Sequence, residues 1–448
     1  MYFVSRGVGD GPDAEVGLQT TQREGLNLHH VNVLDYPEVV GDGAHDDTAG
    51  LQAALDSGAS VVHLPTPPAN YLISRTLQIH SGQTLLADRN AVIRLADHAH
   101  AHLLTNADHG TLSRGITIKG GIWDGNNAHQ TCEYHQNGFE WRVPYDPARY
   151  LGVMLQFNNV EDLHISGLTL KDPEAFGIQM GNLRRFTVED VTFDYNLLKL
   201  NMDGVHLHGN CHEGRIANLK GTTNDDLVAL NADDGWMYEL SRGPITDIQV
   251  DGIWSDNGFT AVRMLSGGSP IRRVRVSNVF GTFRYYVCTM GHYSVHPDEP
   301  SEISDIVFDG IFCSKPPQPL ANPTQWDEGA VHGVPFFWVE GLTLIRNLMV
   351  NNLIRTETVE NAPPCFFISE GARVEHLGVC NASQVNLASA PLDFLHNEGT
   401  IENLSLLNVH CRAEGGSPRG VIVRNTGEIV HEQRSNVRTH NLAGGEGD

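Results

Sequence analysis

Leu163-His164-Ile165-Ser166-Gly167-Leu168 is an early copy of a short pattern that returns along most of the chain. The pattern has apolar residues at its first, third and sixth positions and a small or polar pair before the last. The starts lie about 23 to 42 residues apart once weaker copies near 214 and 377 are included, which is the period of a stacked repeat architecture. Further clear copies begin at Phe186, Ile248, Val274, Ile306, Leu348 and Leu404.

Each copy predicts a short strand followed by a sharp turn. Apolar residues at positions i and i+2 share one face of a strand, and the Asn or Gly that follows lets the chain turn. One such coil cannot bury its own apolar face, but stacked coils form a continuous core. The segments are too short and too rich in Val, Ile and Asn for helical repeats, so we expect an all-β fold, a parallel β-helix.

The ends and insertions set the expected domain organisation. Residues 41–55 predict a capping helix with Leu51, Ala54 and Leu55 on one face and with Asp47 or Thr48 as the N-cap. Two polar and aromatic insertions, 124–150 and 314–340, interrupt the repeat and are candidate walls of a site. We expect an N-terminal extension over residues 1–30, a single β-helix domain over 31–430 and a polar tail over 431–448.

Composition narrows the classes of partner. The 448 residues carry a formal net charge of −24, which disfavours nucleic acid and anionic membranes as partners. The seven cysteines form no Cys-x-x-Cys pair, and no stretch is apolar enough to span a membrane. Residues 1–15 lack the apolar core of a signal peptide, so we expect a cytoplasmic protein if this N-terminus is native, and a secreted or periplasmic one if a signal peptide was removed.

The densest carboxylate region lies on two neighbouring repeats. If Val205 and Leu207 align with Val228 and Leu230, then Asp203 stands about one strand spacing (~4.8 Å) from Asp226, with Asp225 beside it. Three acids so close together should raise at least one pKa. A protonated acid beside an ionised carboxylate is the equipment for glycosidic-bond hydrolysis, although single Asp residues at such turns commonly cap the backbone.

These residues resemble the signatures of a known enzyme family. Asn201-Met202-Asp203-Gly204 and Asn224-Asp225-Asp226 resemble the Asn-Thr-Asp-Gly and Gly-Asp-Asp motifs of glycoside hydrolase family 28, the polygalacturonases. Gly121 to Gly125 resembles a further strand of these enzymes. The resemblance covers residues 31 to about 310, and it implies a right-handed parallel β-helix of the pectin-lyase-like superfamily. It also implies an inverting hydrolase in which Asp203, Asp225 and Asp226 share the acid and base roles.

The sequence departs from the family in two places. The coil that carries Gly-His-Gly in the family has no histidine at 256–263, and the Arg-Ile-Lys element corresponds at best to Phe283-Arg284-Tyr285. His206 or His208 could replace the imidazole, and we expect His208, Asn231 and Arg263 to form one outward column. Arg263 and Arg284 are candidate partners for a sugar carboxylate, or else compensate nearby acids. We predict substrate contacts from Asn201, His206, His208, Asn231, Asp233, Arg263, Arg284 and Tyr285.

The leading hypothesis is a glycosidase that acts on an α-linked oligo- or polysaccharide, with galacturonic acid as a candidate sugar. The alternatives are a lyase, epimerase or glycosyl transferase on the same fold, or a non-catalytic carbohydrate-binding β-helix in which the acids cap turns. We expect no cofactor and no metal. The sequence leaves open the sugar, the linkage, exo or endo action, and the oligomeric state.

Overall fold

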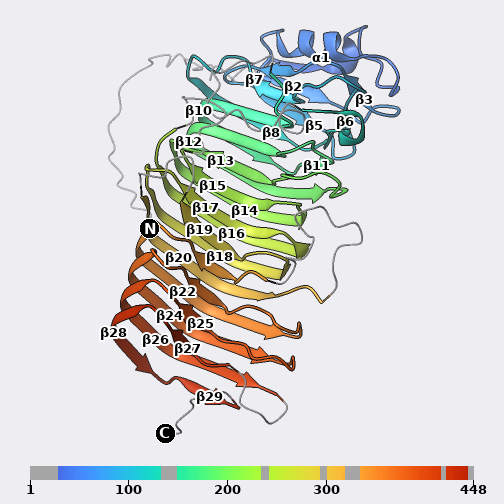
Figure 1. Cartoon of the computed structure of the whole chain (residues 1–448). Helices are drawn as coiled ribbons and strands as arrows, with labels where there is room; N and C mark the ends of the chain where they lie inside the picture. The colour runs from blue at the N-terminus through green and yellow to red at the C-terminus, as the bar shows by residue number, and fades with distance from the viewer. Residues whose placement is uncertain are drawn as a thin grey trace, which may run out of the picture.

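Strands stack in parallel along one axis to form the body of the molecule (Figure 1). The computed structural model describes residues 29–132, 149–233, 242–292, 300–317, 333–414 and 420–441. Most of the predicted N-terminal extension, the central parts of both predicted insertions and residues 442–448 therefore lie outside the described residues. The architecture is a right-handed parallel β-helix, as predicted.

The strands and helices are numbered in chain order, from the capped N-terminal end of the stack to its C-terminal end. The first section comprises β1 (His30–Asn32), α1 (Thr48–Leu55), β2 (Val61–Leu64), β3 (Tyr71–Ile73), β4 (Leu77–Ile79), β5 (Thr84–Ala87), β6 (Val92–Leu95), β7 (Leu104–Asn106), β8 (Ser113–Lys119) and β9 (Ile122–Asp124), with 3-10 helices at Val33–Asp35 and Asn127–His129. The central section comprises β10 (Leu155–Ser166), β11 (Thr169–Lys171), β12 (Ile178–Asp194), β13 (Val205–His208), β14 (Cys211–Thr222), β15 (Asp226–Ala232), β16 (Ile245–Gly258), β17 (Thr260–Ser266), β18 (Ile271–Phe283), β19 (Cys288–His292) and β20 (Ser301–Ser314). The last section comprises β21 (Phe337–Val339), β22 (Thr343–Glu357), β23 (Phe366–Ile368), β24 (Arg373–Asn386), β25 (Leu395–Asn397), β26 (Thr400–Ala413), β27 (Val423–Asn425), β28 (Glu428–Ser435) and β29 (Arg438–His440).

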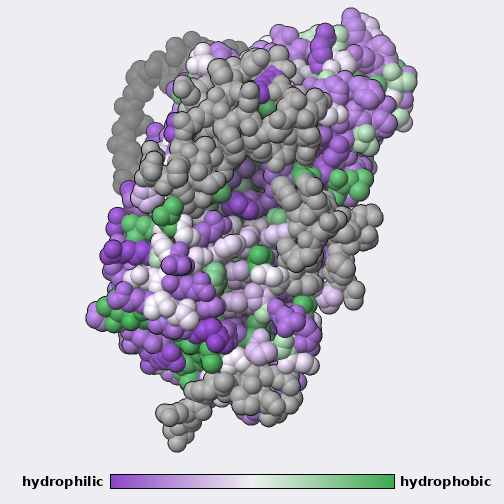
Figure 2. All heavy atoms as spheres, in the orientation of Figure 1, coloured by the Kyte–Doolittle hydropathy of each residue, from purple (hydrophilic) through white to green (hydrophobic). Residues whose placement is uncertain are grey.

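The repeat that decides the fold stacks in register with its neighbours. Leu163 and Ile165 of β10 lie beside Phe186 and Val188 of β12, and all four side chains are buried. The same inward columns continue through later coils, so the core is a line of apolar side chains inside the helix. On the face seen in Figure 2, hydrophobic groups form separate patches on a mainly hydrophilic surface.

Asparagines hold the bends between strands. Asn352, Asn381, Asn408 and Asn436 adopt left-handed backbone angles (φ between 52° and 57°), a conformation that Asn tolerates better than most residues. The amides of Asn381, Asn408 and Asn436 each donate to the side-chain oxygen of the asparagine one coil earlier, over 3.3, 2.9 and 2.8 Å. The polar residue after each strand therefore supplies both the turn and a hydrogen-bonded ladder along the stack.

The N-terminal end is capped by α1, whose Leu51, Ala54 and Leu55 are buried. Asp47 occupies the N-cap position, but its carboxylate makes no cap hydrogen bond to α1. Its two oxygens instead accept from the backbone N–H groups of Val40, Gly41 and Leu72. Asp47 thus fastens the capping segment to strand β3.

The C-terminal end differs from the predicted boundary at residue 430. Strands β28 and β29 pair with β26, so the coil continues through much of the segment that we expected to be a polar tail. The polar side chains of this last coil are exposed, which explains why hydrophobic patterning does not reveal it.

All seven cysteines are free thiols, and six of them are buried. Within the described residues, no helix is long and apolar enough to cross a membrane.

Candidate active site

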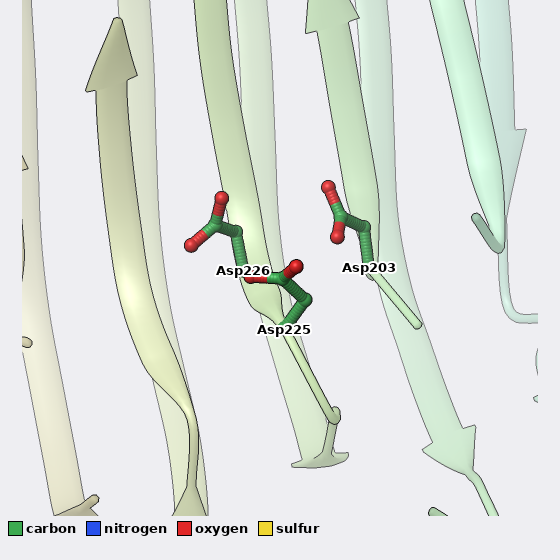
Figure 3. Close-up of side chains that lie close together, drawn as sticks. All are labelled: Asp203, Asp225 and Asp226. Carbon is green, nitrogen blue, oxygen red and sulfur yellow. The ribbon is translucent and has the colours of Figure 1, made fainter. Parts of the chain in front are cut away.

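Asp203, Asp225 and Asp226 come together on two neighbouring coils, as their spacing predicts (Figure 3). Val205 pairs with Val228 and Leu207 with Leu230, which is the predicted register. One oxygen from each of the three carboxylates lies within 4.8 Å of the others. All three side chains are buried, with exposed fractions of 2%, 7% and 3% in chain order.

Gly204 allows the two coils to approach at this point. A Cβ atom at residue 204 would lie 2.5 Å from the backbone oxygen of Leu227, a distance that no side chain can adopt. The Gly204 N–H donates to the Asp226 carbonyl over 2.9 Å. The glycine next to Asp203 is therefore a packing requirement that sets the spacing of the acids.

His206 is the direct partner of Asp203. Its Nδ1 lies 2.5 Å from Asp203 Oδ2, and its Nε2 lies 3.3 Å from the side-chain amide of Asn231. The imidazole stacks on Phe176 at 4.3 Å with an interplanar angle of 20°. Asp203, Asn231 and Phe176 therefore hold the ring on three sides.

Arg263 is the direct partner of Asp226. Its Nε lies 2.6 Å from Asp226 Oδ2, and the arginine side chain is 25% exposed. Among the described residues Asp225 has no such direct cation, and Arg263 and His206 act on it only as nearby charges. The three acids therefore share a site but have different counter-charges.

Burial raises the pKa values of all three acids, and repulsion between carboxylates adds to the shift of Asp203 and Asp225. Burial raises the pKa of Asp203 to about 7, against the lowering effect of the His206 hydrogen bond. Burial, followed by the charges of Asp226 and Asp203, raises the pKa of Asp225 well above its usual range. Burial also raises the pKa of Asp226, while Arg263 opposes the shift. Near neutral pH such a group can hold a proton and donate it.

Arg284, a predicted substrate contact, holds the turn beside the acids. The side chain is fully buried. Its guanidinium donates to the Asn224 side-chain oxygen over 2.9 Å and to the Asn257 carbonyl over 2.6 Å. Asn224 directly precedes Asp225, so Arg284 fixes the turn that carries this acid.

Asp233, another predicted substrate contact, is a turn residue. Its carboxylate accepts from the backbone N–H groups of Gly243 and Ser269 over 2.9 and 2.5 Å. The two oxygens therefore join consecutive coils. This is the backbone-capping role that Asp often has in turns.

The remaining predicted contacts lie at different depths around the acids. Asn201 occupies the turn before Asp203 with φ of 60°, and His208 is fully buried with its ring 4.7 Å from that of His206. Tyr285 is half-buried and stacks on Phe259 at 3.9 Å. The prediction that His208, Asn231 and Arg263 form one column is wrong. In the strand register, His206 pairs with Ala229 and Ala229 with Arg263, whereas His208 pairs with Asn231 and Asn231 with Leu265.

Several neighbours of the site were not found from the sequence. Phe176 stacks on His206, and the Tyr195 hydroxyl donates to the Asp203 carbonyl over 3.1 Å. Glu340 accepts from Thr289 over 3.0 Å, close enough to Arg263 to act on its charge. Phe176 and Tyr195 lie between repeats, where alternation gives no signal. The position of Glu340 directly after β21 is visible only once the coils are aligned.

The three carboxylates are close enough together to ligate one cation. In this structure Arg263 and His206 already bind two of them. Arg263 therefore supplies a positive charge next to Asp226.

Comparison with known proteins supports the resemblance at the level of family and fold. Residues 109–257, which include all three acids, match the model of the glycosyl hydrolases family 28. Among curated proteins, no match to the sequence is found.

Solved structures share the architecture at low sequence identity. They include PfbA, a surface adhesin of Streptococcus pneumoniae, with a TM-score of 0.60, 15% identity and 91% of each chain covered. They include a family 28 exopolygalacturonase of Yersinia enterocolitica, with a TM-score of 0.54, 13% identity, and 90% of this chain and 78% of that chain covered. They also include the A-module of the mannuronan C-5 epimerase AlgE4 of Azotobacter vinelandii, with a TM-score of 0.55, 14% identity, and 91% and 100% covered. The resemblance to glycosyl hydrolases family 28 is thus confirmed over residues 109–257, on a right-handed parallel β-helix.

Proposed function

We propose that this protein is a glycoside hydrolase that cleaves an α-linked oligo- or polysaccharide with Asp203, Asp225 and Asp226. The observation that carries the proposal is the grouping of three buried carboxylates, of which two have a direct positive or hydrogen-bonding partner among the described residues and the third has none there. A structural β-helix has no need for such a group, because burying mutually repelling acids costs stability.

Asp225 is the proposed general acid. It has the strongest reasons to hold a proton, since it is buried beside two other carboxyl groups and no described residue bonds to it as a cation. In the reaction its proton passes to the glycosidic oxygen as the bond from that oxygen to the anomeric carbon breaks.

Asp203 and Asp226 are the proposed water-binding pair. Oδ1 of each is buried and accepts no hydrogen bond from the described residues, while each Oδ2 lies against His206 or Arg263. A water held by the two free oxygens would attack the anomeric carbon and lose its proton to one of the carboxylates. The products are a new hemiacetal hydroxyl and a leaving alcohol, so the protons balance and Asp225 is reprotonated by solvent.

The spacing bears on the stereochemistry. The acids lie closer together than the roughly 6.5–9.5 Å that is usual for an inverting pair, and nearer to the separation of about 5 Å in retaining enzymes. We nevertheless propose inversion, because Arg263 and His206 stabilise the Asp226 and Asp203 carboxylates and so weaken both as nucleophiles. The family resemblance implies the same outcome.

The test is hydrolysis of α-linked oligosaccharides, both galacturonic acid oligomers and neutral ones, followed through new reducing ends. Asp203→Asn, Asp225→Asn and Asp226→Asn should each lower kcat by at least about 10²-fold, the lower range for loss of a general acid or base. Asp190→Asn is the matched control, because Asp190 is exposed at a left-handed turn that Asn also tolerates. Near-full activity in the three site variants would refute the proposal, and an unsaturated uronide as product would indicate a lyase instead.

A further inference from the structure

The outward column that contains His206 and Arg263 changes character on the two sides of the acids. The column follows the strand register through eight consecutive pairings, one residue per coil. Amide side chains occupy its N-terminal part and aromatic rings its C-terminal part. In order the residues are Gln156, Gln179, His206, Ala229, Arg263, Thr289, Trp338, Phe367 and His396.

The N-terminal part of the column is closed. Gln156 and Gln179 are 1% and 0% exposed, and the Gln156 amide donates to the Gln179 oxygen over 2.8 Å. Phe176 covers one face of His206. A glycan at the acids therefore finds no open surface along this column on the N-terminal side.

The C-terminal part is an aromatic wall, by which we mean Tyr286, Trp338, Phe367 and His396. Neighbouring ring centroids lie 5.6, 6.3 and 5.2 Å apart in that order. Trp338 and Phe367 are half-buried, and the His396 side chain is 24% exposed. Tyr286, the first ring of the wall, lies close enough to Arg263 and Glu340 for both charges to act on its hydroxyl. The wall therefore begins beside these two residues.

The ring angles separate this wall from an ordinary stacked column. On another face of the helix, Trp254, Phe280 and Phe312 stack at interplanar angles of 6° and 5°, so each ring covers the face of the next. In the wall, Trp338 and Phe367 are tilted by 53°, and Phe367 and His396 by 68°. Tilted rings leave parts of their faces uncovered by their neighbours in the wall, although Tyr286 itself is only 7% exposed.

The indole of Trp338 is held in place, as a binding platform requires. Its Nε1–H donates to the Ser369 hydroxyl over 2.6 Å, which fixes the ring through a residue of the next coil. Beside it, the hydroxyl of Thr289 and the carboxylate of Glu340 form a polar edge. A sugar ring has the matching chemistry, with an apolar C–H face and a rim of hydroxyl groups.

We propose that the aromatic wall binds the successive pyranose rings of a glycan whose cleaved bond lies at the three acids. The inference rests on the proposed function, and it adds where the rest of the substrate lies and in which direction it runs. At ~4.8 Å per strand, the four steps from Arg263 to His396 span about 19 Å, which accommodates several sugar rings. Because the other side of the column is closed, the chain extends toward the C-terminal coils.

The test compares Trp338→Ala and Phe367→Ala with wild type on galacturonic acid oligomers and on neutral α-linked oligomers of two to six units. We expect KM to rise up to about tenfold for the longer oligomers and by less for the dimer. Trp254→Ala is the matched control, since Trp254 is 39% exposed in the stacked column and should leave KM unchanged at every length.

The possible outcomes distinguish failure of the inference about the wall from failure of the proposed function. If wild type cleaves either series and both wall variants match it at every chain length, the wall is not a binding site and the inference is overturned. If wild type cleaves neither series, the proposed function fails and the inference fails with it. A chain-length-independent fall in kcat in the wall variants would also contradict it, because it would show a structural effect on the acids.

Discussion

The three carboxyl groups share burial but differ in their nearest neighbours. Asp203 lies against an imidazole, Asp226 against a guanidinium, and Asp225 against the other two acids. Because an opposite charge favours the ionised form and a like charge disfavours it, this arrangement separates a proton donor from two proton acceptors. Identical side chains thus acquire different roles from their surroundings.

Arg263→Gln should move the pH dependence of the reaction. The guanidinium lowers the pKa of Asp226, so its removal raises this pKa and the carboxylate forms only at higher pH. The acidic limb of the kcat profile should therefore move upward by roughly one pH unit or more. Arg275→Gln is the control, because Arg275 pairs with Asp309 on another face and should leave the profile in place. An acidic limb that stays in place in Arg263→Gln would contradict the pairing.

Asp225→Asn should stabilise the protein at neutral and higher pH. The folded-state pKa of Asp225 is raised above its usual value, so its favourable contribution is present at low pH and is lost as pH rises through the folded pKa. The amide does not ionise, and the free energy of unfolding of the variant should exceed that of wild type by about 1 kcal/mol or more at pH 8.

Urea denaturation at pH 4 and pH 8 measures this difference. The gain should shrink toward pH 4, where Asp225 is protonated in the folded state and close to its ordinary pKa in the unfolded state, and Asp190→Asn should show no such pH dependence. A variant less stable than wild type at pH 8 would show that the acid is not under electrostatic strain.

At the residue level, the alternation of apolar residues along a strand predicts which acids lie side by side. It does not predict how deeply a side chain is buried. The register of Val205 with Val228 follows from apolar spacing, and it places Asp203 beside Asp226. Arg284 and Asp233 belong to turns, where alternation stops. Their partners are backbone and amide groups 10 to 60 residues away, which a sequence pattern cannot locate.

At the level of elements, the turn between β18 and β19 supports the turn that carries Asp225. Arg284 reaches back to Asn224, and Lys315 donates through Nζ to the Arg284 carbonyl over 3.2 Å. Burial lowers the pKa of Lys315 well below its usual range. The acid is thus positioned by a buried polar network that extends over later coils.

Arg284→Met should weaken both the fold and the reaction. The change leaves the Asn224 oxygen and the Asn257 carbonyl without their donor, which costs roughly 1–3 kcal/mol for each unsatisfied group. Because Asp225 then loses its support, kcat should fall on the order of 10²-fold. Denaturation and steady-state kinetics measure the two effects.

Arg284→Lys is the companion variant, since an ammonium can reach only part of this network. It should retain more stability and more activity than Arg284→Met. If Arg284→Met instead raised KM specifically for acidic oligosaccharides with kcat unchanged, Arg284 would contact substrate, and the buried role assigned to it would be wrong.

The sequence predicts strands that belong to the repeat, but it does not predict where the first and last strands and the capping helix make their contacts. The copies beginning at Leu163 and Phe186 identify strands because every coil buries the same two positions. The cap residue Asp47 was placed correctly along the chain, but its bonds go to β3 and not to α1. A local motif shows where a helix starts, while tertiary packing decides what its side chains bind.

At the level of the whole molecule, the stack places the site between coils that support it from both sides. Each coil contacts its neighbours through backbone ladders and asparagine side chains, so stability is distributed along the axis. The formal charge of −24 belongs to this surface as a whole and is least favourable for a long polyanion. The periodicity of the sequence predicts the fold. The proposed direction of a bound glycan could be inferred only from the strand register of nine coils in the structure.

The most direct measurement of the central claim is proton NMR of the first product formed from an α-linked oligosaccharide. Wild type should release a new reducing end that is first observed as the β-anomer, and Asp225→Asn should release none on the same timescale. Appearance of the α-anomer first would contradict water attack assisted by Asp203 and Asp226. Turnover of Asp225→Asn at the wild-type rate would contradict the assignment of the acid.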